Sequence, residues 1–144
     1  MTAYVLEIGE PPRSEDVAAL VRGLDAHAMP HTGAAGFKPL GVFLRDDGGA
    51  IVGGASGFVN WNWLFINLVW LSESLRGAGH GRLLIEALEQ AARDRGCTHA
   101  HLDTFSFQAR PFYEKLGYEV FSTLDDYPPG HRRFFMKKAL GAAG

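Results

Sequence analysis

Cysteine, net charge and long apolar runs are all scarce in this sequence, and each scarcity argues against a class of protein. Cys97 is the single cysteine among 144 residues, so no disulfide can form within the chain, and a reducing, cytoplasmic location is expected. The longest apolar stretch, near residues 61–71, is far shorter than the roughly 20 residues that cross a bilayer. A formal net charge of −2 gives no general attraction to nucleic acid or to a membrane surface. The first ten residues also lack the basic and apolar regions of a signal peptide.

Apolar residues, by contrast, make up 47% of the chain, which is enough to form a buried core. The length suits one domain, which we expect over residues 1–140, with a disordered tail at residues 141–144. No internal repeat or low-complexity segment divides it.

The predicted order of elements is β-α-β-β-β-α-β-α-β-β, an α/β fold with a mixed sheet. Apolar alternation and turn residues predict strands at residues 4–8, 38–45, 50–60, 63–71, 98–104, 118–124 and 132–138. Helical spacing predicts one helix capped by Ser14 and stopped by Pro30, a second over about residues 80–95 and a third at residues 109–116. The strand–helix–strand segment from residue 63 to 104 should be a parallel crossover, with antiparallel hairpins around it and helices on both faces.

A glycine-rich turn lies between the strand at 63–71 and the helix that follows. It reads Arg76-Gly77-Ala78-Gly79-His80-Gly81 and is followed by Arg82. The first amides of a helix have no partners within the helix, and the helix dipole adds positive charge there. Glycine lets the backbone approach a ligand closely, and the two arginines can add charge-assisted contacts. The turn therefore predicts a phosphate-binding site.

The turn could bind one of three kinds of phosphate ligand, or it could bind no ligand at all. The Gly-x-x-x-x-Gly-Lys-Ser/Thr pattern of a nucleoside triphosphate loop is absent. A dinucleotide fingerprint would place glycine where Arg82 stands, although Asp103 lies about 20 residues on, as that fingerprint requires. An ordinary strand–helix turn without a ligand is the remaining alternative to the interpretation that follows.

Two sequence blocks resemble the family of Gcn5-related N-acetyltransferases (GNAT). The glycine turn fits that family's Gln/Arg-x-x-Gly-x-Gly/Ala pattern. A second block, Ala109-Arg110-Pro111-Phe112-Tyr113-Glu114-Lys115-Leu116-Gly117-Tyr118, is similar to the family's Ala-x-x-Phe-Tyr-Glu-Lys-Leu-Gly-Phe/Tyr stretch. One helix and one strand separate the blocks, as in the family, and the element order matches from residue 4 to about 140.

The resemblance implies a GNAT-like fold and acetyl-CoA as co-substrate. It implies that the strand end at Val69, Trp70 and Leu71 pairs with the pantetheine arm, with a bulge there that aims an amide at the thioester carbonyl. It implies that Arg76 to Gly81 bind the pyrophosphate and that Tyr113 protonates the departing thiolate. Ser106 stands where the family often has an asparagine that contacts the CoA arm, and it is a shorter donor and acceptor.

The base that deprotonates the amine is less evident. Glu73 just after one strand and Asp103 at the end of the next are the candidates, each acting through water, although either could be a surface or capping acid. Cys97 has no activating neighbours in sequence and should be structural, so transfer should be direct.

Other groupings have simpler interpretations. His99, His101 and Asp103 alternate along one strand face, but without further ligands we expect a polar face and no metal site. The basic residues at 131–133 and 137–138 could meet the adenosine phosphate of CoA or an acidic acceptor, or form a solvated strand end. Aromatic residues are dense at residues 58–70, and Phe105 and Phe107 follow; most should be core, but those near the gap between the strands at 63–71 and 98–104 could wall an acceptor pocket for a compact, hydrophobic amine.

The sequence therefore predicts direct acetyl transfer from acetyl-CoA to a primary amine of a small molecule or an exposed protein amine. A non-catalytic acyl-CoA-binding or sensing module and an NAD-binding enzyme are the alternatives. No nucleic-acid or membrane partner is expected, and a sheet-edge homodimer is compatible with the resemblance.

Overall fold

Residues 2–141 are described by the computed structural model of the chain, so residues 142–144 of the expected tail lie outside the described part. The chain divides into two compact units, Met1–Ala35 and Gly36–Gly144, which are described separately. Among the described residues, no helix has both the length and the apolar character needed to cross a membrane.

Within residues 2–35, the described part of the first unit, the chain forms helix α1, Ser14–Thr32, and no strand. The strand predicted at residues 4–8 is wrong, because these residues find no strand to pair with in this unit and apolar side chains such as Leu6 stay exposed. The predicted stop at Pro30 is also wrong. A proline near a helix end costs only one hydrogen bond, and the helix ends at Gly33, whose φ is 68° and whose N–H donates to the Met29 carbonyl. Arg13, not Ser14, is the N-cap residue.

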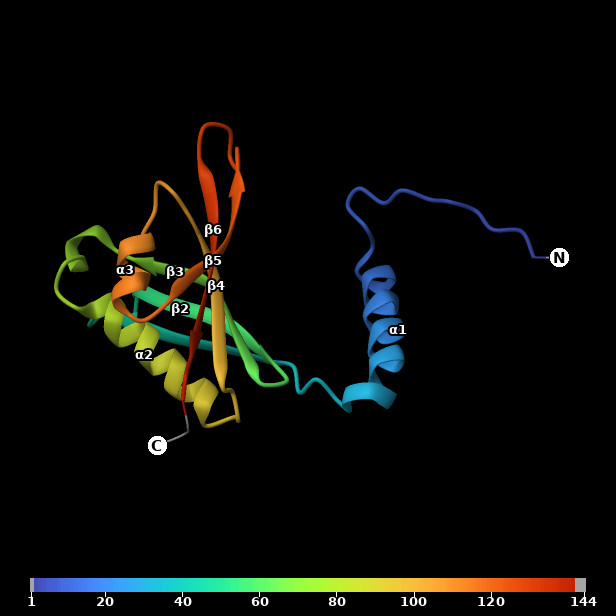
Figure 1. The fold of residues 1–144 in the computed structure, drawn as a ribbon, viewed down its shortest axis with the longest axis horizontal. Coiled ribbons are helices and arrows are strands. Elements are labelled where there is room, and N and C mark those ends of the chain that lie inside the picture. The colour runs from blue at the N-terminus through green and yellow to red at the C-terminus, as the bar shows by residue number, and fades with distance from the viewer. Residues whose placement is uncertain (1, 142–144) are drawn as a thin grey trace. The chain divides into compact units, whose positions relative to one another are not determined.

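The second unit is built on one six-stranded mixed sheet (Figure 1). Its strands are β1 (Lys38–Arg45), β2 (Ile51–Asn60), β3 (Trp63–Leu71), β4 (His99–Phe105), β5 (Glu119–Asp125) and β6 (Arg132–Ala139), in the spatial order β1-β2-β3-β4-β6-β5. The β3–β4 pair is parallel and every other pair is antiparallel. This confirms the predicted mixed α/β sheet and its parallel crossover.

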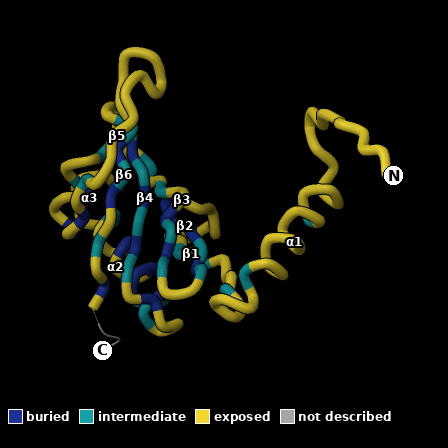
Figure 2. Tube along the Cα trace, turned by 45° about the vertical axis from the view of Figure 1, so that its right-hand side comes forward, coloured by how far each residue is buried: buried dark blue, intermediate teal, exposed yellow. Residues whose placement is uncertain are grey.

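Helices α2 (His80–Arg93) and α3 (Arg110–Lys115) lie on the same side of this sheet (Figure 1). Leu84, Ile85 and Leu88 of α2 are fully or almost fully buried because their spacing of three and four places them on one helix face. They pack in one cluster with Leu64 of β3 and Met136 of β6, and the buried segments in Figure 2 trace this layer. The core thus lies between α2 and α3 and one face of the sheet.

A β-bulge interrupts β3 at Asn67. Ser56 of β2 pairs with Leu68 and the next residue, Gly57, pairs with Ile66, so Asn67 is the extra residue. At Gly57 a Cβ atom would lie only 2.1 Å from the Phe65 carbonyl oxygen, so only glycine allows the two backbones to approach this closely. The bulge lies two residues before the stretch of Val69 to Leu71 where it was expected.

The sheet face opposite α2 carries histidines packed on aromatic rings. His99 stacks on Trp63 with ring centroids 4.6 Å apart, and His101 lies 4.8 Å from Phe65. Asp103 is paired with Arg133 instead of joining them. Among the described residues, no three histidine, cysteine or acidic side chains come together in a group that could hold a metal ion.

Acid should destabilise the protein partly through His101. Burial lowers the pKa of His101 below its ordinary value of 6.5, although the Asp103 charge acts in the opposite direction. As the pH falls, His101 is therefore protonated in the unfolded chain, near pH 6.5, before it is protonated in the folded protein. The free energy of unfolding is highest above pH 6.5 and decreases as the pH falls from 6.5 to the lower pKa of the folded state. Urea titrations should show a smaller loss of unfolding free energy between pH 7 and pH 5 for His101→Phe than for the wild type. A variant of the exposed His27, His27→Phe, is the control, and equal losses in all three proteins would contradict the expectation.

Candidate active site

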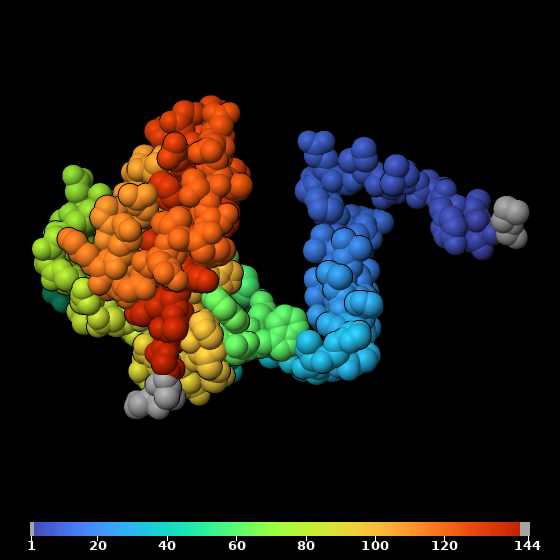
Figure 3. All heavy atoms as spheres, in the orientation of Figure 1, coloured from blue at the N-terminus to red at the C-terminus, as the bar shows by residue number. Residues whose placement is uncertain are grey.

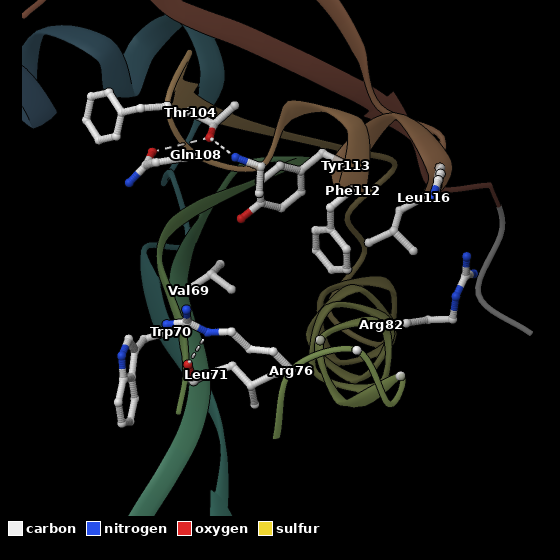
Figure 4. A pocket seen from close by; sticks show the side chains of 16 residues that line it. Val69, Trp70, Leu71, Arg76, Arg82, Thr104, Gln108, Phe112, Tyr113 and Leu116 are labelled. Carbon is white, nitrogen blue, oxygen red and sulfur yellow. Dashed lines mark hydrogen bonds between the residues drawn. The ribbon is translucent and has the colours of Figure 1, made fainter. Parts of the chain in front are cut away.

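Two cavities meet where strands β3 and β4 part. The parallel ladder ends at the pair Ile66 and Leu102, and beyond it the strands diverge and leave a slot between them. A larger cavity of about 790 Å³ lies between the end of β3, the glycine turn and α3 (Figure 4). A smaller cavity of about 270 Å³ occupies the slot itself. Tyr113, Gln108, Thr104 and Val69 line both, so the two cavities adjoin.

The glycine turn forms one wall of the larger cavity. Gly77 and Gly79 have φ angles of 81° and 87°, which glycine adopts without strain, and Gly79 is the N-cap residue of α2. No side chain caps this helix end, so its first amides stay available for a ligand. Gly81 has another role, because a Cβ atom there would lie 3.0 Å from the Phe112 ring. The absence of a side chain at Gly81 therefore lets α2 and α3 pack closely.

Three cationic side chains line the larger cavity: Arg76, Arg82 and Lys115. Arg76 Nε donates a hydrogen bond of 3.1 Å to the Leu71 carbonyl, which holds its guanidinium at the end of β3 (Figure 4). Arg82 forms an exposed ion pair of 3.2 Å with Glu86. The cavity therefore combines free helix amides with positive charge, which suits a phosphorylated ligand.

Tyr113 is buried in α3 and directs its hydroxyl group into the cavity (Figure 4). Burial, and next the Asp103 charge, raises the pKa of Tyr113 to about 12. The phenol is therefore fully protonated at neutral pH and can serve as a hydrogen-bond donor there.

The backbone of β3 also faces the slot. Ser72 N–H donates to Val52 of β2, whereas the Leu71 carbonyl accepts from Arg76 on the opposite side. The backbone N–H and C=O groups of residues two apart in a strand point to the same side. Those of Val69 therefore point to the same side as those of Leu71, and the Val69 N–H is directed toward the slot. The exposed Trp70 side chain lies on the rim of the larger cavity.

Several residues expected at the site lie outside both linings. Ser106 accepts a 3.0 Å hydrogen bond from the Arg132 amide in the neighbouring hairpin. Glu73 is exposed on the short 3₁₀ helix η1 (Glu73–Leu75). Ala78 and His80 line neither of the two cavities, and His80 Nδ1 lies 3.2 Å from the Leu75 carbonyl. Gln108 and Thr104, which the sequence did not single out, line both cavities instead and contact each other at 3.3 Å.

Asp103 is the one acidic side chain that lines the smaller cavity. Arg133 holds it through Nε at 3.0 Å and through Nη2 at 2.8 Å. Two other members of the basic group are also engaged with acids, Arg132 with Asp125 and Lys138 with Glu89. Cys97 is buried and lines neither cavity, and burial raises the pKa of its thiol, which disfavours the reactive thiolate.

Replacement of Gly79 by alanine should weaken the binding of CoA about tenfold, because alanine disfavours this positive φ by about 1–2 kcal/mol and the turn would leave the conformation that directs its amides into the cavity. The position opens on free space, so the effect would come from the backbone and not from a clash. Titration calorimetry with CoA measures it. Gly23→Ala, also in open space but without a positive φ, should bind CoA as the wild type does. Equal affinities for the wild type and Gly79→Ala would contradict the role given to this turn.

Comparison with known proteins agrees with this geometry. The family model described as "Acetyltransferase (GNAT) family" matches residues 13–118, and the chain belongs to this family of acetyltransferases. A curated relative, the blasticidin-S acetyltransferase of Streptomyces morookaense, is 37% identical over 107 residues, which are 72% of this chain and 79% of that protein.

Two solved structures are also similar. An acetyltransferase from Bacillus cereus ATCC 14579 has a TM-score of 0.82 at 29% identity and covers 94% of this chain and 97% of its own. An acetyltransferase structure from Agrobacterium tumefaciens has a TM-score of 0.83 at 26% identity, with 96% and 99% covered. The fold and the enzyme class are thereby established.

Proposed function

We propose that this acetyltransferase moves the acetyl group of acetyl-CoA directly to the primary amine of a small molecule in the cytoplasm. The observation that carries the proposal is that Tyr113 lines both cavities. On one side lies a large cavity with free helix amides and cations, and on the other a small slot that holds one carboxylate, Asp103. An acyl donor and an amine acceptor can therefore meet beside one phenol. The small volume of the slot favours a small amine over a protein chain.

The residues around the larger cavity fit acetyl-CoA. The amides at the start of α2 and the side chain of Arg82 would hold the pyrophosphate, and Lys115 lies close enough to the same cavity to meet another phosphate. The free edge of β3 at Val69 and Leu71 offers backbone groups to an amide-containing arm. When bound, acetyl-CoA supplies an acetyl group activated as a thioester.

The amine must lose its proton before it can attack. Asp103 is the better placed of the two acids considered, because it lines the slot whereas Glu73 does not. We assign to Asp103 the attraction of the ammonium group and the acceptance of its proton through water, which passes it to solvent.

The transfer itself then forms one N–C bond and breaks one C–S bond. The amide of Val69, which points toward the slot, would donate to the acetyl oxygen as negative charge develops on it. The Tyr113 hydroxyl would donate a hydrogen bond to the departing sulfur, which takes its proton from solvent. An ammonium and a thioester thus give an amide, a thiol and one proton released to solvent.

The test is thiol release from acetyl-CoA with a panel of amines, together with mass spectrometry of the products. The panel should include blasticidin S because of the 37% identical relative. A product heavier by one acetyl group, formed at a saturable rate, supports the proposal. Tight CoA binding without turnover of any amine would show a binding module instead. Acetylation of Cys97 during turnover would contradict direct transfer.

A further inference from the structure

The smaller cavity contains a carboxylate held in one fixed orientation. Both contacts from Arg133 go to Oδ1 of Asp103, and among the described residues no donor bonds to Oδ2. The Asp103 side chain is 17% exposed, so this second oxygen is left to whatever enters the slot. Arg133 is itself held, with its guanidinium 4.9 Å from the Tyr127 ring and 5.3 Å from the Phe135 ring. One oxygen of Asp103 is therefore fixed and the other is available for a cation.

Beside this carboxylate lies a ladder of aromatic rings, formed by Phe107, Phe105 and Tyr127. Phe105 and Phe107 stack with centroids 5.4 Å apart and an interplanar angle of 1°, and Tyr127 continues the ladder 5.9 Å from Phe105. Phe105 lines the smaller cavity and Phe107 the larger one. The ladder joins the end of β4 to the hairpin of β5 and β6, which stands out from the rest of the second unit (Figure 3).

Phe107 presents the exposed ring face of the ladder to a cavity. It is 58% exposed and has His131 in edge contact at 5.0 Å, whereas Tyr127 lies against the Arg133 guanidinium and Phe105 stacks with both of its neighbours. A flat ligand ring can stack on such a face at little entropic cost, because the rings are already ordered by their neighbours. The available carboxylate oxygen and the ring faces lie at the same end of β4.

We propose that the acceptor is a compact primary ammonium attached to a flat, unsaturated ring. Asp103 Oδ2 binds the ammonium and the exposed ring of Phe107, backed by Phe105, binds the ligand ring, while Arg133 is a positioning residue for Asp103. This assignment of a substrate class rests on the proposed function.

Size and charge exclude the obvious alternatives. At about 270 Å³ the slot is near the lower limit for small-molecule sites, so a bulky acceptor cannot be enclosed in it. A polyamine or a lysine-rich peptide brings further cations, and Arg133 is the charged side chain next to the single carboxylate. An amino acid brings a carboxylate beside the reacting amine, which Asp103 repels. A single cation with an apolar ring matches the groups present.

The class is tested with the full chain and a matched set of acceptors. The set comprises phenethylamine, its cyclohexyl analogue, phenylalanine, spermidine and a lysine-containing peptide. We expect phenethylamine to show the highest kcat/KM and phenylalanine to fall about tenfold below it, because its carboxylate meets Asp103. Higher kcat/KM for spermidine or the peptide would overturn the proposal, as would equal values for the phenyl and cyclohexyl compounds.

Variants locate the effect in the named residues. Asp103→Asn should raise the KM for phenethylamine about 10- to 100-fold, the worth of one charge-assisted hydrogen bond, and Arg133→Met should raise KM more than it lowers kcat. Phe107→Leu should remove the preference for the phenyl over the cyclohexyl compound. Asp125→Asn, in an exposed ion pair of the same hairpin, and Phe43→Leu on β1 are the matched controls.

Calorimetry with CoA separates this inference from the function on which it rests. Asp103→Asn, Arg133→Met and the two controls should bind CoA as the wild type does, which also shows that they are folded. Phe107 lines the larger cavity, so Phe107→Leu is judged by the ratio of its kcat/KM values for the phenyl and cyclohexyl compounds. Normal CoA binding with Asp103→Asn indistinguishable from Asp125→Asn overturns the subsite and the role given to Asp103, while acetyl transfer to an amine still stands. No turnover of any amine by the wild type would overturn the proposed function itself, and the subsite with it.

Discussion

Removal of one oxygen atom, in Tyr113→Phe, is expected to lower kcat by about 10²–10³-fold and to leave the affinity for CoA unchanged. The range is the lower part of what a positioned acid–base group contributes. The hydroxyl lies in the cavity, whereas the ring is part of the core and phenylalanine fills the same space. Single-turnover thiol release at saturating amine, with CoA affinity from calorimetry, measures the two quantities separately.

The raised pKa of Tyr113 is the reason why the expected loss of kcat lies in the lower part of that range. A phenol with a pKa of about 12 is a weaker acid than a thiol, whose ordinary pKa is about 8.5. Full proton transfer to the leaving sulfur is then uphill, and the hydroxyl acts chiefly by donating a hydrogen bond to the developing thiolate. For the same reason kcat should not fall through ionisation of Tyr113 between pH 8 and pH 10.

A second tyrosine provides the control for this variant. Tyr118 is also buried, but its hydroxyl donates a 2.7 Å hydrogen bond to Glu89 and lines neither cavity. Tyr118→Phe removes the same atom from another place, so it should cost stability and keep kcat. If Tyr113→Phe and Tyr118→Phe had the same kcat, or if Tyr113→Phe kept the wild-type rate, the role of Tyr113 as donor to the sulfur would be refuted.

The parts of the site that are local in sequence could be predicted from it. The conformations of the turn from Arg76 to Gly81 and of the segment around Tyr113 each depend on about ten consecutive residues. Positive φ angles and the start of a helix are determined by residues close in sequence. The parallel crossover followed from the order of elements alone.

The parts that depend on strand pairing could not be predicted in the same way. The bulge at Asn67 exists because Gly57, ten residues earlier, lets β3 approach β2. Asp103 is oriented by Arg133, 30 residues later. Residues 4–8 have the composition of a strand, but a strand forms only where a partner offers its hydrogen bonds. In each case the deciding contact is distant in sequence.

Stability should depend most on a carboxylate far from the chemistry. Glu89 of α2 is 1% exposed, and both its oxygens accept from Lys138 Nζ at 3.0 Å while one also accepts from Tyr118. Arg93 lies 4.0 Å away on the same helix. Glu89→Ala would remove the acceptor and leave Lys138, whose side chain is one-fifth exposed, with an uncompensated charge. Breaking such a pair costs about 3–5 kcal/mol, and the partial exposure of Lys138 places the expected loss near 3 kcal/mol.

Urea unfolding of Glu89→Ala measures this loss as a lower midpoint at an unchanged slope. A double variant separates the charge from the packing. Glu89→Leu combined with Lys138→Met replaces the ion pair by apolar groups of similar volume and should recover most of the stability, because no charge is then left unpaired. The recovery is expected to be incomplete, since the Tyr118 hydroxyl loses its acceptor in both proteins, and adding Tyr118→Phe should restore part of the remainder. Were the double variant no more stable than Glu89→Ala, the uncompensated charge of Lys138 would not be the source of the loss, and this account of the ion pair would be refuted.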